Sequence, residues 1–89
     1  MTPHDLLSIR DLARRTGCRM VLVERFFYLG VVEEVEVRDG EPYFRASAVD
    51  RVQRALRIRS DLRISTSSLG LVLDLLERIE RLESELERQ

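Results

Sequence analysis

Two short amphipathic helices are predicted in the first third of the chain from the spacing of its apolar residues. Residues 1–7 form a lead-in that can pack as a small strand. Ser8 then stands three residues before Asp11, the arrangement of a capping box at the start of a helix. The first helix is expected to run to about Thr16. Gly17 supplies the break, because glycine leaves helical geometry at the lowest cost.

The second helix is expected over about 19–29, and Gly30 ends it, so that 12–31 forms a helix-turn-helix unit. Val21 and Leu22 fall largely off the face that is expected to pack inward. Their side chains are then either covered by the C-terminal part of the chain or exposed, and exposed apolar residues beside charges are typical of partner sites. The inward face is expected to consist of Met20, Val23, Phe26 or Phe27, and Leu29.

A β-hairpin is predicted in the middle of the chain, with strands over 32–37 and 43–45. Asp39-Gly40 between them is a strong hairpin signal, because a type I′ turn needs residues that tolerate positive φ. Pro42 has no N–H to donate, so its strand is expected at an edge. Valine alternates with charged residues in the first strand, so one face of this wing is expected to be apolar. That face carries Val35 and Val37.

A third helix is expected to begin with Ser47 as its cap, with Asp50 three residues on, and to end near Leu62. One face of it is apolar. Its arginines lie around the rest of the cylinder, where they form a solvated face, ion pairs with the acidic wing, or contacts with a partner. The apolar face carries Val49, Val52 and Leu56, and the arginines are Arg51, Arg54, Arg57 and Arg59.

A fourth helix over about 66–88 would be roughly 30–35 Å long. Apolar residues along it follow the 3-4-3-4 spacing of a coiled-coil seam. A second stripe in its first half provides one face for the head of the molecule, while the seam provides another for a partner helix. The seam predicts a homodimer, with parallel and antiparallel pairing both open. The seam residues are Val72, Leu75, Ile79, Leu82 and Leu86, and the second stripe is Leu69, Leu73 and Leu76.

The fold class predicted from these elements is mainly α with a small β-hairpin wing. A winged helix-turn-helix head is expected over 1–64 and a C-terminal amphipathic dimerisation helix over 65–89, as one compact domain overall. Folding of 89 residues buries only roughly 60–65% of the chain's surface. Part of the stability is therefore expected to come from a second subunit.

Composition and motifs argue against catalysis. The charges nearly cancel, with 15 basic residues, all of them arginine, against 16 acidic ones, which gives no global attraction to nucleic acid. Cys18, expected as a small buried hydrophobe, and His4 would be far apart in any compact fold. Because a phosphate-binding glycine loop and metal-ligand spacing are also missing, we expect no enzyme, cofactor or metal site. Without a signal peptide or membrane span in the sequence, the expected location is the cytoplasm.

The sequence LARRTG at 12–17, followed by a second helix and LGVV at 29–32, resembles the MerR-type helix-turn-helix head. A closer resemblance is to chaperone modulators of the CbpM type. It is carried by LGVVE at 29–33, VQRALRIRSDL at 52–62 and the leucine-rich helix at 69–85. This resemblance implies a MerR-like shape and a partner that is the J-domain of a DnaJ- or CbpA-like co-chaperone, alone or in complex with DnaK.

The second helix departs from the pattern of MerR-type DNA binders, which usually carry basic or polar residues where this chain has Val21, Leu22 and Glu24. Valine and leucine offer no donors to base edges or phosphates. A carboxylate that faces phosphate is repelled by roughly 1 kcal/mol at a separation of about 4 Å in water. The wing is acidic as well, so the expected partner is a protein and not DNA.

Two functions of different classes remain open. One is a chaperone modulator that binds a J-domain and regulates its work with Hsp70 (DnaK), either by inhibiting the partner or by assembling it into a complex. The other is a MerR-like transcription regulator, whose dimer would place two helix-turn-helix units on DNA half-sites. We favour the first, because J-domains usually carry a basic helix that an acidic wing complements. The predicted partner-binding residues are Val21, Leu22, Glu24, Arg25, Glu33, Glu34 and Glu36.

Overall fold

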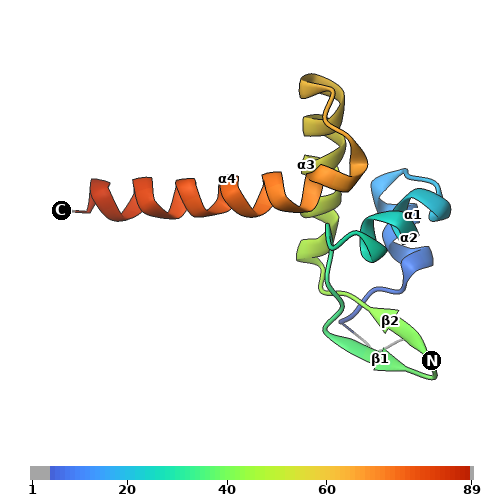
Figure 1. Ribbon diagram of the computed structural model, residues 1–89. Coiled ribbons are helices and arrows are strands. Elements are labelled where there is room, and N and C mark those ends of the chain that lie inside the picture. Colours follow the sequence, from blue (N-terminus) through green and yellow to red (C-terminus); the bar gives the residue numbers. More distant parts are fainter. Residues whose placement is uncertain (1–4, 89) are drawn as a thin grey trace.

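The computed structural model describes residues 5–88, which form a helical head with a hairpin on one side and a long helix that projects from it (Figure 1). The predicted fold class, mainly α with a winged helix-turn-helix head, is confirmed. No helix in this part of the chain combines the length and the apolar character that crossing a bilayer requires. The elements are α1 (Ile9–Thr16), α2 (Met20–Tyr28), β1 (Glu36–Arg38), β2 (Glu41–Tyr43), α3 (Ser47–Leu62) and α4 (Thr66–Glu87).

The first helix begins and ends as its sequence predicts. The Ser8 N–H donates to the Oδ2 of Asp11 at 3.0 Å, and the Asp11 N–H donates to the Oγ of Ser8 at 3.1 Å, so the capping box is complete. These bonds hold the pKa of Asp11 below its ordinary value, with the Ser8 backbone bond as the main cause. Gly17 ends the helix at φ 70°, a conformation that glycine adopts at little cost.

The inward face of α2 is narrower than the predicted one. Val23 and Phe26 are fully buried, and Phe27 packs edge-on against Phe44 with 5.7 Å between ring centroids. Met20 and Leu29 were predicted to be inward, but they are 40% and 37% exposed. They stand at the two ends of a nine-residue helix, where the packed face runs out. Leu22, predicted off this face, is half-buried and packs against the core.

The wing has the predicted turn, but its two strands are displaced toward that turn from the predicted ranges. Asp39 and Gly40 both take positive φ, 52° and 77°, and Val37 pairs with Pro42 in the two-stranded antiparallel sheet. Strand β1 begins four residues later than predicted and β2 ends two residues earlier, because Val32 and Phe44 are drawn into the core. On the side of the turn both strands reach further than predicted, to Arg38 and from Glu41. The expected apolar face is not covered by the described chain, since Val35 is 46% and Val37 59% exposed.

The lead-in joins the head through Leu7, which exchanges both backbone hydrogen bonds with Phe44 at 2.7 and 2.8 Å. His4 lies outside the described residues. Helix α3 starts at Ser47 without a side-chain cap, so the predicted capping role of Ser47 is wrong; Ala46 occupies the cap position in an already helical conformation. Its buried face is made of Ala48, Val52 and Ala55, with Val49 and Leu56 packed at the margin.

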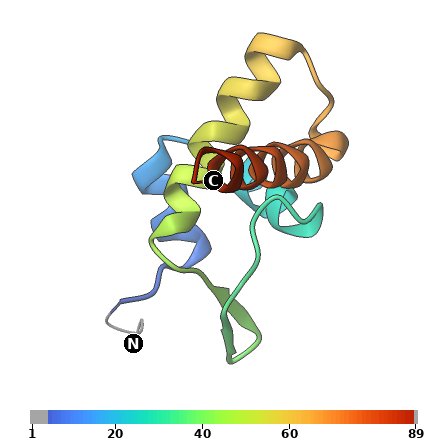
Figure 2. The same ribbon diagram turned by 90° about the vertical axis from the view of Figure 1, so that its left-hand side faces the viewer.

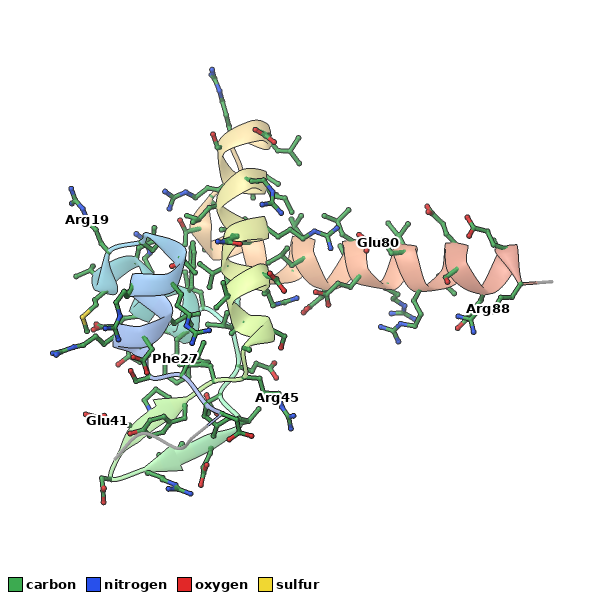
Figure 3. All side chains as sticks on the ribbon, turned by 180° about the vertical axis from the view of Figure 1, so that it is seen from behind. Arg19, Phe27, Glu41, Arg45, Glu80 and Arg88 are labelled. Carbon is green, nitrogen blue, oxygen red and sulfur yellow. The ribbon has the colours of Figure 1, made fainter. Side chains whose placement is uncertain are left out.

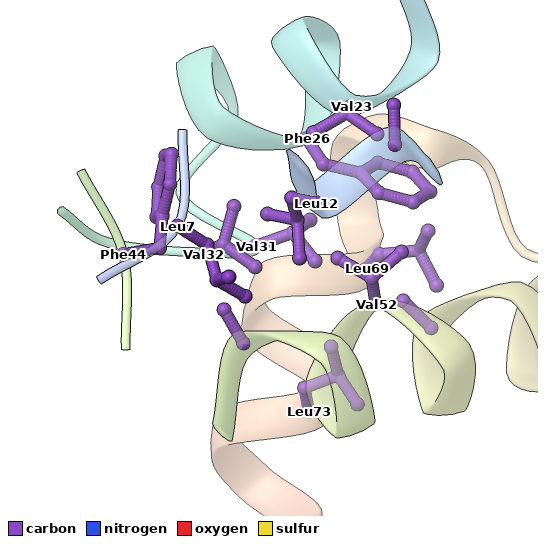
Figure 4. Packing of buried hydrophobic residues seen from close by; sticks show 13 residues of the cluster. Leu7, Leu12, Val23, Phe26, Val31, Val32, Phe44, Val52, Leu69 and Leu73 are labelled. Atoms are coloured by element: carbon purple, nitrogen blue, oxygen red, sulfur yellow. The ribbon is translucent and has the colours of Figure 1, made fainter. Parts of the chain in front are cut away.

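The start of α4 completes the core of the head (Figure 4). Leu69 and Leu73, from the second stripe, are fully buried, as that stripe predicts. Between them, Gly70 lies so close to the end of α2 that an added Cβ would stand 3.2 Å from the backbone oxygen of Leu29. The helix crosses α3 and then leaves the head (Figures 1 and 2). The division of the chain after residue 64 stays a prediction.

Two arginines of α3 fix the direction of α4. Arg51 donates from Nη2 to Asp74 at 2.9 Å, and it also bonds to Glu77 and to the backbone oxygen of Val31. Arg54 pairs with Glu80 one turn further along both helices. From the sequence we expected a solvated face, ion pairs with the wing, or contacts with a partner protein. The structure shows a different environment for these two arginines, because their ion-pair partners lie on α4 and not on the wing.

Candidate partner-binding surface

The outward face of α2 carries an exposed stripe of two apolar side chains with a cation between them. Val21 is 75% and Tyr28 79% exposed, and the side chain of Arg25 is exposed as well. Residues seven apart stand on the same side of a helix, two turns from each other. Tyr28 was missed from the sequence, although its position two turns after Val21 is a signal that could have found it. We call Val21, Arg25 and Tyr28 the α2 stripe.

The other two predicted residues of α2 flank this stripe. Leu22 is half-buried, so only part of its side chain is available to a partner. Glu24 is half-buried on the opposite side, where it lines a hollow of about 360 Å³ between α1, α2 and β2. Glu41 and Met20 line the same hollow, and neither was among the predicted partner-binding residues.

The predicted wing carboxylates lie in different surroundings. Glu33 and Glu34 are exposed in the linker between α2 and β1. Glu33 lines an open groove of about 500 Å³ together with residues of α3 and α4, and not the hollow beside Glu24. Glu36 accepts a hydrogen bond from the Nε of Arg38 at 2.7 Å, a contact that raises the pKa of Arg38. The predicted set is therefore spread over two sides of the head.

Positive charge gathers on α1 and on the turn that follows it. Figure 3 shows Arg19 at one end of the α1–α2 unit, pointing away from the molecule, while Glu41 lies on the hairpin at the other end. Arg14 is neutralised by Asp11, with 2.6 Å between Nη2 and Oδ1. The head thus has a basic end and an acidic wing. The exposed basic residues of the α1 end are Arg10, Arg14, Arg15 and Arg19.

The seam of α4 faces away from the head over most of its length. Val72 is half-buried, whereas Leu75, Ile79, Leu82 and Leu86 are between 49% and 67% exposed. Leu71 was not predicted in this set, but it lies on the same side and is 65% exposed. Figure 3 shows the distal part of α4, beyond Glu80 and up to Arg88, extending away from the head.

No group of three or more metal-ligating side chains occurs among residues 5–88. Cys18 is a free thiol, half-buried against the core, where it packs as a small apolar side chain.

Comparison with known proteins identifies the family. A family model described as "MerR HTH family regulatory protein" matches residues 7–88. Chaperone modulatory proteins CbpM from Salmonella paratyphi B, Salmonella newport and Salmonella heidelberg are each 32% identical to this chain over 78 residues. The aligned part covers 88% of this chain and 77% of each relative. The chain belongs to the CbpM family of MerR-like helix-turn-helix proteins.

The match to the MerR HTH family model extends to the projecting helix as well as the head. The matched region begins at Leu7, whose backbone bonds attach the lead-in to Phe44, and it ends at the close of α4. The resemblance drawn from the sequence is thereby confirmed. In this CbpM-family chain the second helix of the helix-turn-helix unit, α2, carries the exposed α2 stripe.

Proposed function

We propose that the chain is a chaperone modulator that works by binding the J-domain of a DnaJ- or CbpA-like co-chaperone, and not by catalysing a reaction. The observation that carries this proposal is the α2 stripe. Valine and tyrosine stand fully outward on the helix that a DNA reader would use to present hydrogen-bond donors. The name of the CbpM relatives, chaperone modulatory protein, supports the same proposal.

The stripe has the composition of a protein interface. Tyrosine and arginine are enriched among the residues that dominate binding energy, especially when they are desolvated at the centre of a contact. Val21 and Tyr28 would provide the apolar anchors, and Arg25 the polar contact between them. The acidic side chains of Glu33 and Glu34, exposed and outside the ion pairs of the described chain, would attract the basic helix of a J-domain.

Two consequences for the partner follow from one binding mode. A module that occupies the basic helix of the J-domain would keep Hsp70 from using that surface, and would inhibit the co-chaperone. A module whose remaining surface also contacts DnaK would instead hold the two together. In both cases we expect the chain to work in the cytoplasm, where the DnaK system acts.

The test is a binding titration between the full chain and a purified J-domain of the CbpA type, monitored by isothermal titration calorimetry. We expect saturable binding that weakens in the Val21→Ser/Tyr28→Ser variant. Matched substitutions on the exposed polar side of α4, Ser84→Ala and Arg81→Gln, should leave it unchanged. An absence of binding at concentrations of order 100 μM would reject the proposal.

The second candidate is a DNA-binding regulator of the MerR type, and one observation favours it. Four exposed arginines on α1 and its turn could contact phosphates, although Arg14 is already paired with Asp11. We expect only weak DNA binding that collapses with salt, because few phosphates would be neutralised. A sequence-selective footprint at physiological salt would favour this second function over the first.

We also propose that the chain is a homodimer joined through the α4 seam. A row of leucine and isoleucine at heptad spacing on an isolated helix is exposed to water unless a second helix covers it. Pairing of two seams would bury Leu75, Ile79 and Leu82, which are each about half exposed in the single chain.

A further inference from the structure

We infer that the hollow between α1, α2 and β2 receives an arginine or lysine side chain of the protein partner, as a specificity pocket beside the α2 stripe. This inference rests on the proposed function for the identity of the partner, but the pocket itself is argued from its walls and its charge. It is formed by the start of α1, the first turns of α2 and the strand β2, which come from three separate parts of the sequence.

Half of the residues that line the hollow are apolar. Ile9 and Met20 line it from the two helices, and Pro42 and Tyr43 line it from the wing. Met20, the first residue of α2, is 40% exposed and lines this hollow. A volume of about 360 Å³ leaves room for a long side chain to lie along these surfaces. Arginine and lysine bury their methylene stems on apolar walls of this kind while the charged head reaches polar groups.

The charge of the hollow selects a cation over other long side chains. Glu24 and Glu41 both line it, against the single guanidinium of Arg10. Neither carboxylate takes part in an ion pair within residues 5–88, in contrast to Glu36, which is bonded to Arg38. The carboxylate of Asp11 nearby on α1 is already engaged by Ser8 and Arg14. The two carboxylates, one from α2 and one from β2, would therefore be the acceptors for an incoming charged head.

The hollow and the α2 stripe can be used together. Met20 and Glu24 line the hollow, and Val21 and Arg25, the residues that directly follow them, belong to the stripe. If a basic helix of the partner packs on Val21, the hollow would thus lie within reach of one of its long side chains. The stripe would supply apolar contact, and the hollow would require a basic residue at one position of the partner.

The experiment compares two double variants that remove the same amount of charge. Glu24→Gln/Glu41→Gln changes the hollow, and Glu33→Gln/Glu34→Gln changes exposed carboxylates outside it. Association and dissociation rates with a CbpA-type J-domain are measured by surface plasmon resonance. Both variants should slow association to a similar degree, since both reduce long-range attraction. Only the hollow variant should dissociate faster, by about tenfold or more, because it alone loses a desolvated contact.

Unchanged dissociation of the hollow variant, with normal binding of the wild type, would overturn this inference and leave the proposed function intact. Glu41→Gln alone, at an exposed position, keeps the test available if the double variant does not fold. If the wild type binds no J-domain, the proposed function fails, and an arginine-rich peptide then tests the hollow directly. The Met20 methyl resonance, one of only two from methionine, should shift with the arginine peptide and not with its citrulline counterpart. No shift would overturn the inference.

Discussion

The Nη2 of Arg51 on α3 lies 2.9 Å from the Oδ1 of Asp74 on α4. The same guanidinium also bonds to Glu77 and to the backbone oxygen of Val31, three residues after the end of α2. One side chain therefore joins the linker after α2, the helix α3 and the first half of α4. It is only 22% exposed, so these contacts are partly shielded from water. The direction in which α4 leaves the head depends on this arginine.

Replacing Arg51 should destabilise the head. Arg51→Gln leaves the buried Val31 carbonyl without its partner and removes two ion pairs, for an expected loss of about 1–3 kcal/mol in the free energy of unfolding. Arg51→Lys should recover only part of this, because an ammonium cannot form the same fork of bonds. Urea unfolding followed by circular dichroism measures both. Arg57→Gln, an exposed arginine on the same helix, should stay within about 0.5 kcal/mol.

Gly70 should resist replacement even by alanine. Alanine is a better helix former by about 1 kcal/mol, but its Cβ would stand 3.2 Å from the Leu29 oxygen and 3.4 Å from the Gly30 oxygen. Both neighbours are backbone atoms, so the two helix ends must move apart. We expect a net loss of about 1 kcal/mol, measured by thermal unfolding. Ser84→Ala on the exposed part of α4 should instead gain a few tenths of a kcal/mol. A more stable Gly70→Ala variant would show that α4 can shift freely.

The elements whose ends depend on local chemistry could be predicted from the sequence. The capping box at Ser8, the break at Gly17 and the turn at Asp39-Gly40 each involve residues only a few positions apart. The buried stripe of α4 was also predictable, because Leu69 and Leu73 repeat at helical spacing. In each case the decisive interaction lies within one element.

The interactions between elements could not be predicted. The partners of Arg51 are 20 to 26 residues away in the sequence, and nothing in its own helix distinguishes it from Arg57. The hollow was missed for the same reason, since Glu24 of α2 and Glu41 of β2 come to line one hollow only in the folded chain. Met20 and Leu29 were predicted to face inward from periodicity alone. Periodicity does not show where the neighbouring elements stop covering a short helix, and both residues are exposed at its ends.

The capping box should make stability depend on pH. The pKa of Asp11 is below its ordinary value of 3.8, mainly through the Ser8 backbone bond, so the carboxylate stabilises the folded state when it is ionised. Its contribution is complete above the ordinary value and is lost as the pH falls through the lower folded-state value. Asp11→Asn should therefore cost roughly 0.5–1 kcal/mol at pH 7 and progressively less toward pH 2. Urea unfolding across this range checks the trend, with Asp61→Asn as the exposed reference.

Charges placed on the α4 seam should separate the proposed dimer. Ile79→Glu/Leu82→Glu puts two carboxylates where the seams would meet, and the variant should sediment as a monomer with an intact head. Ser84→Glu adds charge about 160° around the helix from Leu82, and it should leave the assembly unchanged. Analytical ultracentrifugation distinguishes these results. A wild type that sediments as a monomer at high micromolar concentration would exclude the dimer.

The last prediction concerns the residue of α2 that best separates binding from folding. Val21 is 75% exposed, so Val21→Ser should change the melting temperature little, as surface substitutions usually cost within about 0.5 kcal/mol. If Val21 is desolvated in the complex, the same change should weaken J-domain binding by about 1–3 kcal/mol, mainly through faster dissociation. Leu22→Ser cannot make this distinction, because Leu22 packs against the core and its loss should lower the melting temperature as well.

Both readouts are needed on the same preparation of Val21→Ser. Weaker binding at an unchanged melting temperature places the contact on α2, and Tyr28→Ala should then give a similar loss, because Tyr28 lies two turns away on the same side. Normal binding by a folded Val21→Ser variant would contradict the assignment. The partner would then have to contact the remaining exposed surfaces, with the arginines of α3 and the outer face of α4 as the next to be changed. Since Arg51 and Arg54 already pair with α4, the search on α3 would begin at Arg57.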